Sequence, residues 1–273
     1  MIGDNFKRAG PVRCGVRLEP VPDVPALVLK GKDDYVCVAD LHLGIETQLR
    51  ASGFNIPSQA PKMLASLEAL SSRAGRLVVL GDVKHRIPSA GAHGHREIRP
   101  FMESLLRSFE SVTVVVGNHD GGLSEVLPEQ CRAVQCHGTR IEDVGLFHGH
   151  MWPSEDAMRS EKLVMAHIHP SVVMVDSIGT RTNDKCWLRA KLVKKRALER
   201  YDACPQELVV VPAFNPLLTG TPVNSAGGVQ LGPLFRNGFV DEGSFDVYLL
   251  DGTKLGRPKK LPARERRQRR RYL

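Results

Sequence analysis

Histidine and aspartate residues gather directly after short apolar runs of this 273-residue chain. Side chains of these types, without thiolates among them, suit manganese, iron or zinc. Two divalent ions about 3.5 to 4 Å apart are a recurring device for phosphoester hydrolysis, because they neutralise phosphate charge and activate the nucleophile. The pattern therefore predicts a two-metal hydrolytic site. Its clusters are Asp40-Leu41-His42, Gly81-Asp82-Val83-Lys84-His85, Gly117-Asn118-His119-Asp120, His148-Gly149-His150 and Ala166-His167-Ile168-His169.

The apolar runs before these clusters are typical of strands in a layered α/β protein. Runs such as Leu77-Val78-Val79-Leu80 do not alternate with polar residues, so both faces of the sheet should be covered. Residues 60–72 and 98–109 carry apolar side chains at helical spacing, and a further helix-like stretch spans 188–201. Residues 215–243 are predicted to form ordered loop and hairpin. The predicted strands are 26–29, 35–39, 77–80, 112–116, 144–147, 163–166, 172–175, 208–211 and 247–250.

The strand ends are expected to bring the clusters together. Carboxyl ends of strands in an open α/β sheet form a common crevice, so residues remote in sequence can meet there. Positions i and i+2 of a strand share a face, so the pairs Asp40-x-His42 and His167-x-His169 could each reach one cation. Asp82 has no histidine two residues on, which makes it the candidate to bridge two ions, and Gly81 before it permits a sharp turn.

The order and intervals of the clusters resemble the motif series of the calcineurin-like metallophosphoesterases, over about residues 34 to 170 and more weakly to about 256. The resemblance implies a four-layer α/β/β/α sandwich of two mixed sheets flanked by helices. It also implies two divalent ions, with Mn²⁺ expected and Zn²⁺, Fe²⁺ or Mg²⁺ as alternatives. His119 would protonate the leaving oxygen or stabilise the phosphoryl group, which is typically worth about 10²- to 10⁴-fold in rate. The implied ligands are Asp40, His42 and His169 for one ion, Asn118, His148 and His167 for the other, and Asp82 between them.

A histidine three residues after Asp82 indicates one branch of this superfamily. Protein Ser/Thr phosphatases carry Gly-Asp-x-x-Asp-Arg-Gly, whereas this chain reads Gly81-Asp82-Val83-Lys84-His85-Arg86-Ile87. His85 resembles instead the phosphate-contacting histidine of the SbcD-type double-strand-break repair nucleases and their small archaeal relatives. The segment Pro212-Ala213-Phe214-Asn215-Pro216 strengthens this placement. Ala166 stands where the family usually has glycine before the final His-x-His, and its methyl group could crowd the site.

Further polar residues near the motifs have competing interpretations. His150 is a supporting or substrate-contacting group or else a solvated side chain, and Asp120 is placed with it as a supporting or substrate residue. Glu46 is expected to form a salt bridge or to support a ligand. Lys84 and Arg86 flank the site and could steer phosphate, but exposure without a specific role is the simpler expectation for them. His93 and His95 have the spacing of a metal pair, but they lie in a Gly-rich loop and are expected to be solvated.

The net charge of +8 belongs entirely to the C-terminal end. Residues 257–273 hold nine Lys or Arg and one Glu, so residues 1–256 carry 29 basic and 29 acidic side chains. We therefore expect a catalytic domain over 1–256 and a basic, disordered tail over 257–273. Such a tail favours contact with a phosphate backbone. The arginines of its last part are Arg264, Arg266, Arg267, Arg269, Arg270 and Arg271.

These features favour a nuclease that cleaves phosphodiester bonds in DNA repair or nucleic-acid processing, with DNA preferred over RNA. A phosphodiesterase or phosphatase for small molecules such as cyclic nucleotides is the first alternative, and a non-enzymatic scaffold of a DNA-processing complex is the second. A helicase, ATPase or ligase is an expected partner, whereas the oligomeric state stays open. The chain has no long apolar run and no secretory signal, so it is expected to be soluble, cytoplasmic and not membrane-bound. Its six cysteines lack CxxC pairs and are expected to be reduced, mostly buried thiols.

Overall fold

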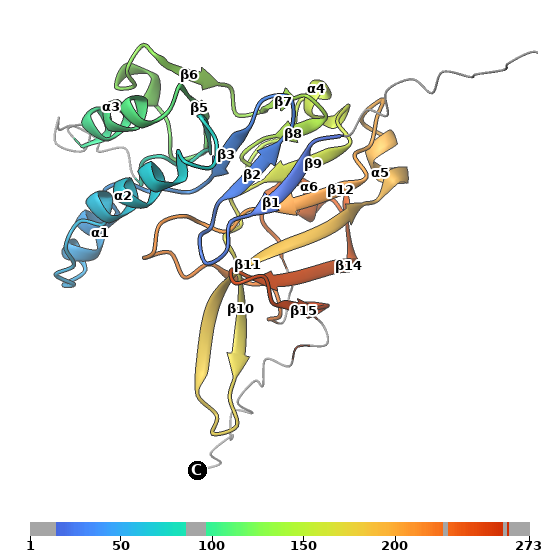
Figure 1. Cartoon of the computed structure of the whole chain (residues 1–273). Helices are drawn as coiled ribbons and strands as arrows, with labels where there is room; N and C mark the ends of the chain where they lie inside the picture. The colour runs from blue at the N-terminus through green and yellow to red at the C-terminus, as the bar shows by residue number, and fades with distance from the viewer. Residues whose placement is uncertain (1–14, 86–96, 226–228, 259–260, 262–273) are drawn as a thin grey trace, which may run out of the picture.

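The computed structural model describes residues 15–85, 97–225, 229–258 and 261 (Figure 1). Its first sheet has the strand order β1-β2-β3-β4-β5-β6. The first three strands pair antiparallel and β3 to β6 pair parallel, so the sheet is mixed. The strands are β1 (Arg17–Pro20), β2 (Leu27–Lys30), β3 (Tyr35–Val38), β4 (Arg76–Leu80), β5 (Ser111–Val115) and β6 (Cys131–Val134).

The second sheet is also mixed and has the order β13-β10-β11-β12-β9-β8-β7, with β14 paired to β11 and β15 to β14. Strands β8, β9 and β12 run parallel to one another, while β11 pairs antiparallel with its neighbours. The strands are β7 (Thr139–Ile141), β8 (Val144–Leu146), β9 (Lys162–Met165), β10 (Pro170–Val175), β11 (Arg181–Leu192), β12 (Glu207–Val210), β13 (Thr221–Pro222), β14 (Val240–Leu249) and β15 (Lys254–Gly256).

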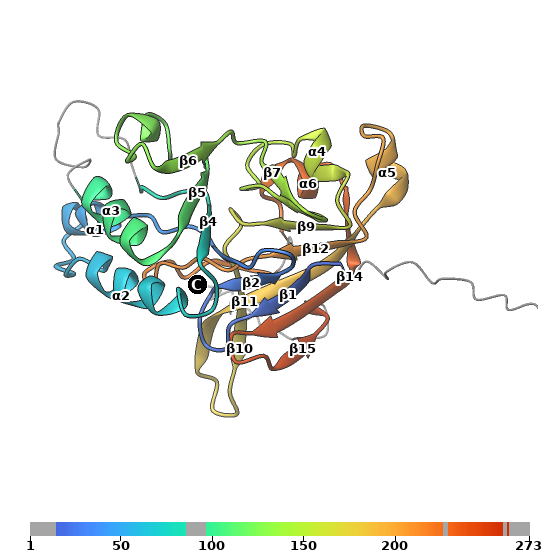
Figure 2. The same cartoon turned by 45° about the horizontal axis from the view of Figure 1, so that its top comes forward.

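Helices cover the outer faces of the two sheets. Figures 1 and 2 show α1 (Ile45–Ala51), α2 (Ala60–Leu70) and α3 (Ile98–Ser108) beside the first sheet. The short helices α4 (Glu155–Met158), α5 (Lys194–Leu198) and α6 (Gly232–Arg236) lie beside the second sheet, and a 3-10 turn (Leu123–Glu125) follows β5. The predicted α/β sandwich of two mixed sheets with flanking helices is confirmed.

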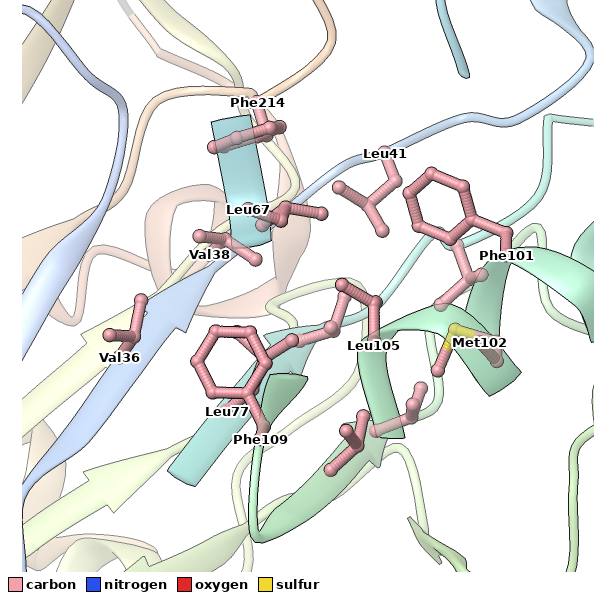
Figure 3. Close-up of a cluster of buried hydrophobic side chains, with 14 of the residues drawn as sticks. Val36, Val38, Leu41, Leu67, Leu77, Phe101, Met102, Leu105, Phe109 and Phe214 are labelled. Atoms are coloured by element: carbon pink, nitrogen blue, oxygen red, sulfur yellow. The ribbon is translucent and has the colours of Figure 1, made fainter. Parts of the chain in front are cut away.

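Three hydrophobic layers hold the sandwich together, and strand β4 shows how. Leu77 and Val79 belong to the cluster under α2 and α3, which Figure 3 draws with Leu67 and Leu105 of those helices. Val78 and Leu80 point the other way, into the cluster between the two sheets. All four residues of this run are buried, as its unbroken apolar sequence predicted. A third cluster lies on the outer face of the second sheet.

Each predicted strand overlaps an observed one, and both long predicted helices are present. The helix predicted over residues 188–201 is wrong in its first half, because β11 continues to Leu192 and only Lys194–Leu198 is helical. Buried and exposed residues alternate from Leu188 to Leu192, which is the period of a strand. The expected hairpin within 215–243 is not formed by the residues described there, which instead contain β13, α6 and the start of β14.

The boundary predicted at residue 257 does not coincide with the end of packing. Pro258 is buried and Leu261 packs against the core of the second sheet. The tail arginines Arg264 to Arg271 lie outside the described residues. Within the described part of the chain, none of the helices has the length and apolar character needed to cross a membrane. The cysteines described there are free thiols, and Cys37, Cys131 and Cys186 are buried.

Candidate metal centre

The chemically competent residues lie just beyond the ends of β3, β4, β5, β8 and β9, where the two sheets meet. Five of them have positive φ angles, from 42° to 71°. Residues other than glycine rarely adopt this left-handed backbone conformation, because it costs of order 1 to 3 kcal/mol for each residue. Such strained residues are typical of functional sites. The five residues are Asp40, His42, Asp82, His167 and His169.

These left-handed turns, rather than strand alternation, aim the side chains. Asp40 and His42 do reach one common cluster, although β3 has already ended at Val38. His167 and His169 point into two different clusters, so the expectation from strand geometry that this pair reaches one cation is wrong, whereas the resemblance implied separate ions for the two rings. The reason is the local backbone: a strand places i and i+2 on one face only while its dihedral angles stay extended.

The first cluster joins the two sheets. Asp40, His42, Asp82 and His169 offer ligand atoms that all lie within 4.8 Å of one another. Nε2 of His169 lies 3.2 Å from Oδ1 of Asp40, and Nε2 of His42 lies 3.4 Å from Oδ2 of Asp82. Asp40 and Asp82 are almost fully buried.

The second cluster consists of Asp82, His148 and His167. Nδ1 of His148 donates a 2.8 Å hydrogen bond to the carbonyl of Leu80, which directs Nε2 of the ring toward the cluster. That Nε2 lies 3.4 Å from Oδ2 of Asp82 and 3.2 Å from the side-chain oxygen of Asn118. Asn118 is thus within reach of the second cluster.

Asp82 is the side chain common to both clusters, as its isolated strand-end position suggested. Gly81 before it has a φ of 78°, and a Cβ atom there would overlap the imidazole of His148. This position therefore requires glycine, because the loop passes directly against a ring of the cluster.

The buried polar atoms of the first cluster fit a cation. Both carboxylate oxygens of Asp40 and Nε2 of His42 and of His169 have no hydrogen-bond partner among the described residues. Leaving a buried donor or acceptor unsatisfied costs about 1 to 3 kcal/mol, more for a charged group. A divalent ion bound by these oxygen and nitrogen atoms would remove that cost. The donor set of carboxylates and imidazoles matches manganese, iron or zinc.

Charges inside the site compensate one another. Burial alone would raise the pKa of the Asp82 carboxyl, but the neighbouring rings of His148 and His42 lower that pKa far below its ordinary range. Burial would lower the pKa of His148, yet Asp82 and Asp40 raise it to about 9. Burial and the charge of His148 lower the pKa of His167 to about 4, which keeps that ring neutral near pH 7. A neutral ring has a lone pair available for a cation.

Two further histidines, His85 and His119, form a third candidate group with His42, and the ligand atoms of the three rings lie within 4.8 Å of one another. The side chain of His119 is 35% exposed, whereas those of Asp82 and His148 are almost fully buried. His85 is half-buried, and its ring lies parallel to that of His119 at a centroid distance of 5.7 Å. A ligand that approaches the clusters from solvent therefore meets these two rings.

The two rings are held by different partners. Nδ1 of His119 donates to the backbone carbonyl of His85, so its Nε2 faces the clusters and lies 4.0 Å from Oδ2 of Asp82. Nε2 of His85 lies 2.8 Å from Oε1 of Gln48, and its Nδ1 lies 3.0 Å from Nδ1 of His42. His85, expected to contact either phosphate or a carboxylate, thus bonds an amide oxygen and a histidine.

The sequence agrees with a family description. Residues 35–249 match the family model of the calcineurin-like phosphoesterases. The chain belongs to this family. Together with the clusters of aspartate and histidine, membership makes it a metal-dependent hydrolase that acts on phosphoester bonds.

Comparison with solved structures agrees with the fold of this phosphoesterase. The nuclease MPE of Pseudomonas putida superposes with a TM-score of 0.50 at 16% sequence identity, over 86% of this chain and 98% of that chain. The phosphoesterase Yfce of E. coli gives a TM-score of 0.36 at 18% identity, over 81% of this chain and 96% of the other. No curated protein matches the sequence. At such identities the first likeness establishes the fold alone.

Asp120 and Lys84 brace the loops of the phosphoesterase site. The carboxylate of Asp120 accepts hydrogen bonds from the backbone N–H of Gly117 (2.8 Å) and of Lys84 (3.3 Å), which ties the loop after β5 to the loop after β4. The expectation that Lys84 is exposed is wrong: it is 2% exposed, and its Nζ donates to the carbonyl of Gly121. Arg86 lies outside the described residues.

The other candidates have more peripheral places. The ring of His150 lies 5.1 Å from that of His148, and its buried Nδ1 has no hydrogen-bond partner among the described residues. Glu46 is buried and accepts a 2.6 Å hydrogen bond from the backbone N–H of Gln59, just before α2. Ala166 is buried between the sheets, where its methyl group belongs to the core rather than to the metal site. His93 and His95 lie outside the described residues.

Two residues near the clusters had no predicted role. Gln48 on α1 bonds His85, and nothing in its exposed helical position signals this contact. Asn215 is fully buried and bonds the backbone of Leu41 and His42. Its signal was the Pro-Ala-Phe-Asn-Pro segment, where an amide between two prolines in an apolar context is unusual.

Proposed function

We propose that this phosphoesterase is a phosphodiesterase that cleaves nucleic acid, preferably DNA, in a repair or processing reaction. The observation that carries the proposal is the pair of half-buried rings, His85 and His119, beside the carboxylate that both clusters share. One ring can contact a non-bridging oxygen of the phosphate, while the other can protonate the leaving oxygen. Both rings are partly exposed, so a substrate phosphate can reach them from solvent.

The proposed ligands follow the two clusters. Asp40, His42 and His169 hold one ion, and Asn118, His148 and His167 hold the other, with Asp82 shared. Mn²⁺ is the preferred ion in this proposal, with Zn²⁺, Fe²⁺ and Mg²⁺ as alternatives. When bound, two such ions stabilise negative charge on the phosphoryl group and make water nucleophilic at neutral pH.

His119 is proposed to protonate the leaving oxygen. Its Nδ1 is occupied by the carbonyl of His85, so Nε2 is the nitrogen that can carry a proton to the substrate. The backbone N–H of His119 is also bonded to Asp82, which keeps the ring at a fixed position beside the clusters. A fixed donor of this kind needs no reorganisation during the reaction.

His85 is proposed to contact a non-bridging oxygen of the phosphate. Its Nε2 bonds the side-chain oxygen of Gln48, which is exposed on α1. A phosphate oxygen can take the place of that amide oxygen without changing the proton on the ring. The partner Gln48 thus keeps the proton on Nε2 until the substrate arrives.

The preference for a polymer rests on two further features. The histidine three residues after Asp82 is the feature that resembles repair nucleases, and the six tail arginines carry positive charge that favours a phosphate backbone. A helicase, ATPase or ligase is the proposed kind of partner, because the printed residues contain no G-x-x-x-x-G-K-[ST] P-loop.

The decisive assay uses the full chain, loaded with Mn²⁺, Mg²⁺ or Zn²⁺, on a panel of substrates. The panel holds bis(p-nitrophenyl) phosphate, single-stranded DNA, duplex DNA, RNA and a cyclic nucleotide, with Asp82→Asn as the inactive control. We expect cleavage of the aryl diester and of DNA with Mn²⁺. If the cyclic nucleotide were the only substrate cleaved, the result would contradict a nuclease and favour a phosphodiesterase for small molecules. Loss of all activity, with no ion bound, would contradict both.

A further inference from the structure

The connection from β12 to β13 links the two halves of the first cluster. Residues 214–221, here called the bridging segment, follow β12 as an orange loop in Figure 1. At one end, the backbone N–H of Phe214 donates to the carbonyl of Ala39 (2.8 Å) and that of Asn215 to the carbonyl of Asp40 (3.3 Å). At the other end, the N–H of Thr221 donates to the carbonyl of His169 (2.8 Å). One segment therefore holds cluster residues from both sheets.

The side chain of Asn215 strengthens the first of these attachments. It is fully buried, and its Nδ2 donates to the carbonyls of Leu41 (2.7 Å) and His42 (3.4 Å). Its Oδ1 accepts from the N–H of Leu217 (2.9 Å), so both ends of the amide are engaged. Asp40 and His42 have φ angles of 56° and 42°, so the carbonyls that Asn215 binds belong to a strained loop.

Lys185 on β11 binds the backbone at the start of the bridging segment. Its Nζ donates to the carbonyl of Ala213 (2.7 Å) and to that of Asn215 (2.5 Å). The ammonium thus ties the backbone of Asn215 to the second sheet, while the amide of Asn215 ties the loop of Asp40 and His42 to the same point. A strained loop persists only when its surroundings hold it in several places.

We propose that Asn215, held by Lys185, is a positioning residue that fixes Asp40 and His42 against His169 and thereby sets the affinity of the first cluster for its ion. The inference rests on the proposed ligand assignment. Groups that orient metal ligands typically contribute about 10- to 100-fold in metal affinity. Asn215 acts through its contacts with the ligand loop, and it offers no ligand atom itself.

The test measures Mn²⁺ binding to the metal-free full chain by isothermal titration calorimetry, together with the melting temperature of each metal-free variant. Asn215→Ala should bind one ion about 10- to 100-fold more weakly and the other as the wild type does. The matched control is Asn224→Ala, because Asn224 makes the same kind of side-chain bonds to the N–H and carbonyl of Val173, on β10 beyond the site. It should retain both affinities.

The outcomes separate this inference from the proposed function. A wild-type chain that binds no ion would contradict the proposed function itself. A wild type that binds two ions, with Asn215→Ala binding both equally well, would overturn only the positioning role, as would equal losses in Asn215→Ala and Asn224→Ala. If Asn215→Ala does not fold, judged by circular dichroism, Lys185→Met decides: weaker binding of one ion supports the role, and unchanged binding overturns it.

Discussion

The backbone N–H of His119 donates a 2.8 Å hydrogen bond to Oδ1 of Asp82. The other oxygen of the same carboxylate lies 3.4 Å from Nε2 of both His42 and His148. One side chain therefore joins the two candidate metal clusters that contain carboxylates and also fixes the loop of the proposed acid. Ion binding and the placement of His119 are linked through this carboxylate.

Asp82→Asn should separate ion binding by this side chain from its hydrogen bond to the loop of His119. The asparagine Oδ1 can still accept from His119, but an amide nitrogen in place of Oδ2 cannot hold a cation. We expect diester hydrolysis to fall by more than about 100-fold and fewer than two Mn²⁺ ions to bind, with an unchanged circular dichroism spectrum. A variant that keeps activity and both ions would contradict a shared carboxylate and favour the scaffold function.

His119→Gln should reveal the proton transfer. We expect kcat for a dinucleotide to fall by about 10²- to 10⁴-fold, because its alkoxide leaving group needs a proton. The loss on bis(p-nitrophenyl) phosphate should be much smaller, since nitrophenolate leaves without one. His137→Gln is a matched control, because His137 is exposed and the one hydrogen bond described for its side chain is to the carbonyl of Trp152. Equal losses on both substrates would contradict the acid role.

Removal of the metal should destabilise the fold. The unpartnered atoms of Asp40, His42 and His169 gain ligand bonds only when an ion is bound. An ion at 100 times its Kd adds about 2.7 kcal/mol to the free energy of unfolding. For a chain of this size that shifts the melting temperature by about 5 to 10 °C. Differential scanning calorimetry with EDTA and with Mn²⁺ measures the shift, and Asp40→Asn should reduce it. Identical melting curves would contradict a metal centre.

Lys185 should produce a specific pH dependence of stability. Burial lowers its pKa from 10.5 to about 8, against the opposing charge of Asp40. Between pH 8 and 10.5 the unfolded chain therefore binds more protons at this side chain than the folded chain does. The free energy of unfolding should rise with pH across this window, by up to about 3 kcal/mol relative to Lys185→Met. Urea unfolding of both metal-free proteins measures it, and parallel profiles would contradict the shifted pKa.

Truncation should reveal the role of the basic tail. The cut belongs after Leu261, because Leu261 packs against the second sheet. Removing residues 262–273 deletes six arginines, so DNA binding should weaken most at low salt and the log–log salt slope should fall by up to about 5. Hydrolysis of bis(p-nitrophenyl) phosphate should not change. Similar losses on DNA and on the small diester would mean that the tail supports the fold instead.

Much of the fold could be predicted because its signals are local. Unbroken apolar runs such as Leu77 to Leu80 predict strands covered on both faces, and β4 indeed divides its side chains between two cores. Clusters that directly follow such runs lie at strand ends by chain connectivity alone. The prediction of a helix over residues 188–201 failed because a strand with alternating buried and exposed residues, Leu188 to Leu192, precedes the short helix.

The sequence by itself determined which residues could serve chemistry, the strand ends that carry them and the family to which the chain belongs. Only the tertiary structure decided how these residues meet: the left-handed turns that aim His167 and His169 apart, the approach of His42 and His148 to one oxygen of Asp82, and the hold of Asn215 on the loop of Asp40 and His42. The physical reason is the separation along the sequence of the residues that interact. Periodicity reflects neighbours along the chain, whereas these contacts depend on how two sheets pack and on left-handed backbone angles that the surrounding contacts impose on non-glycine residues.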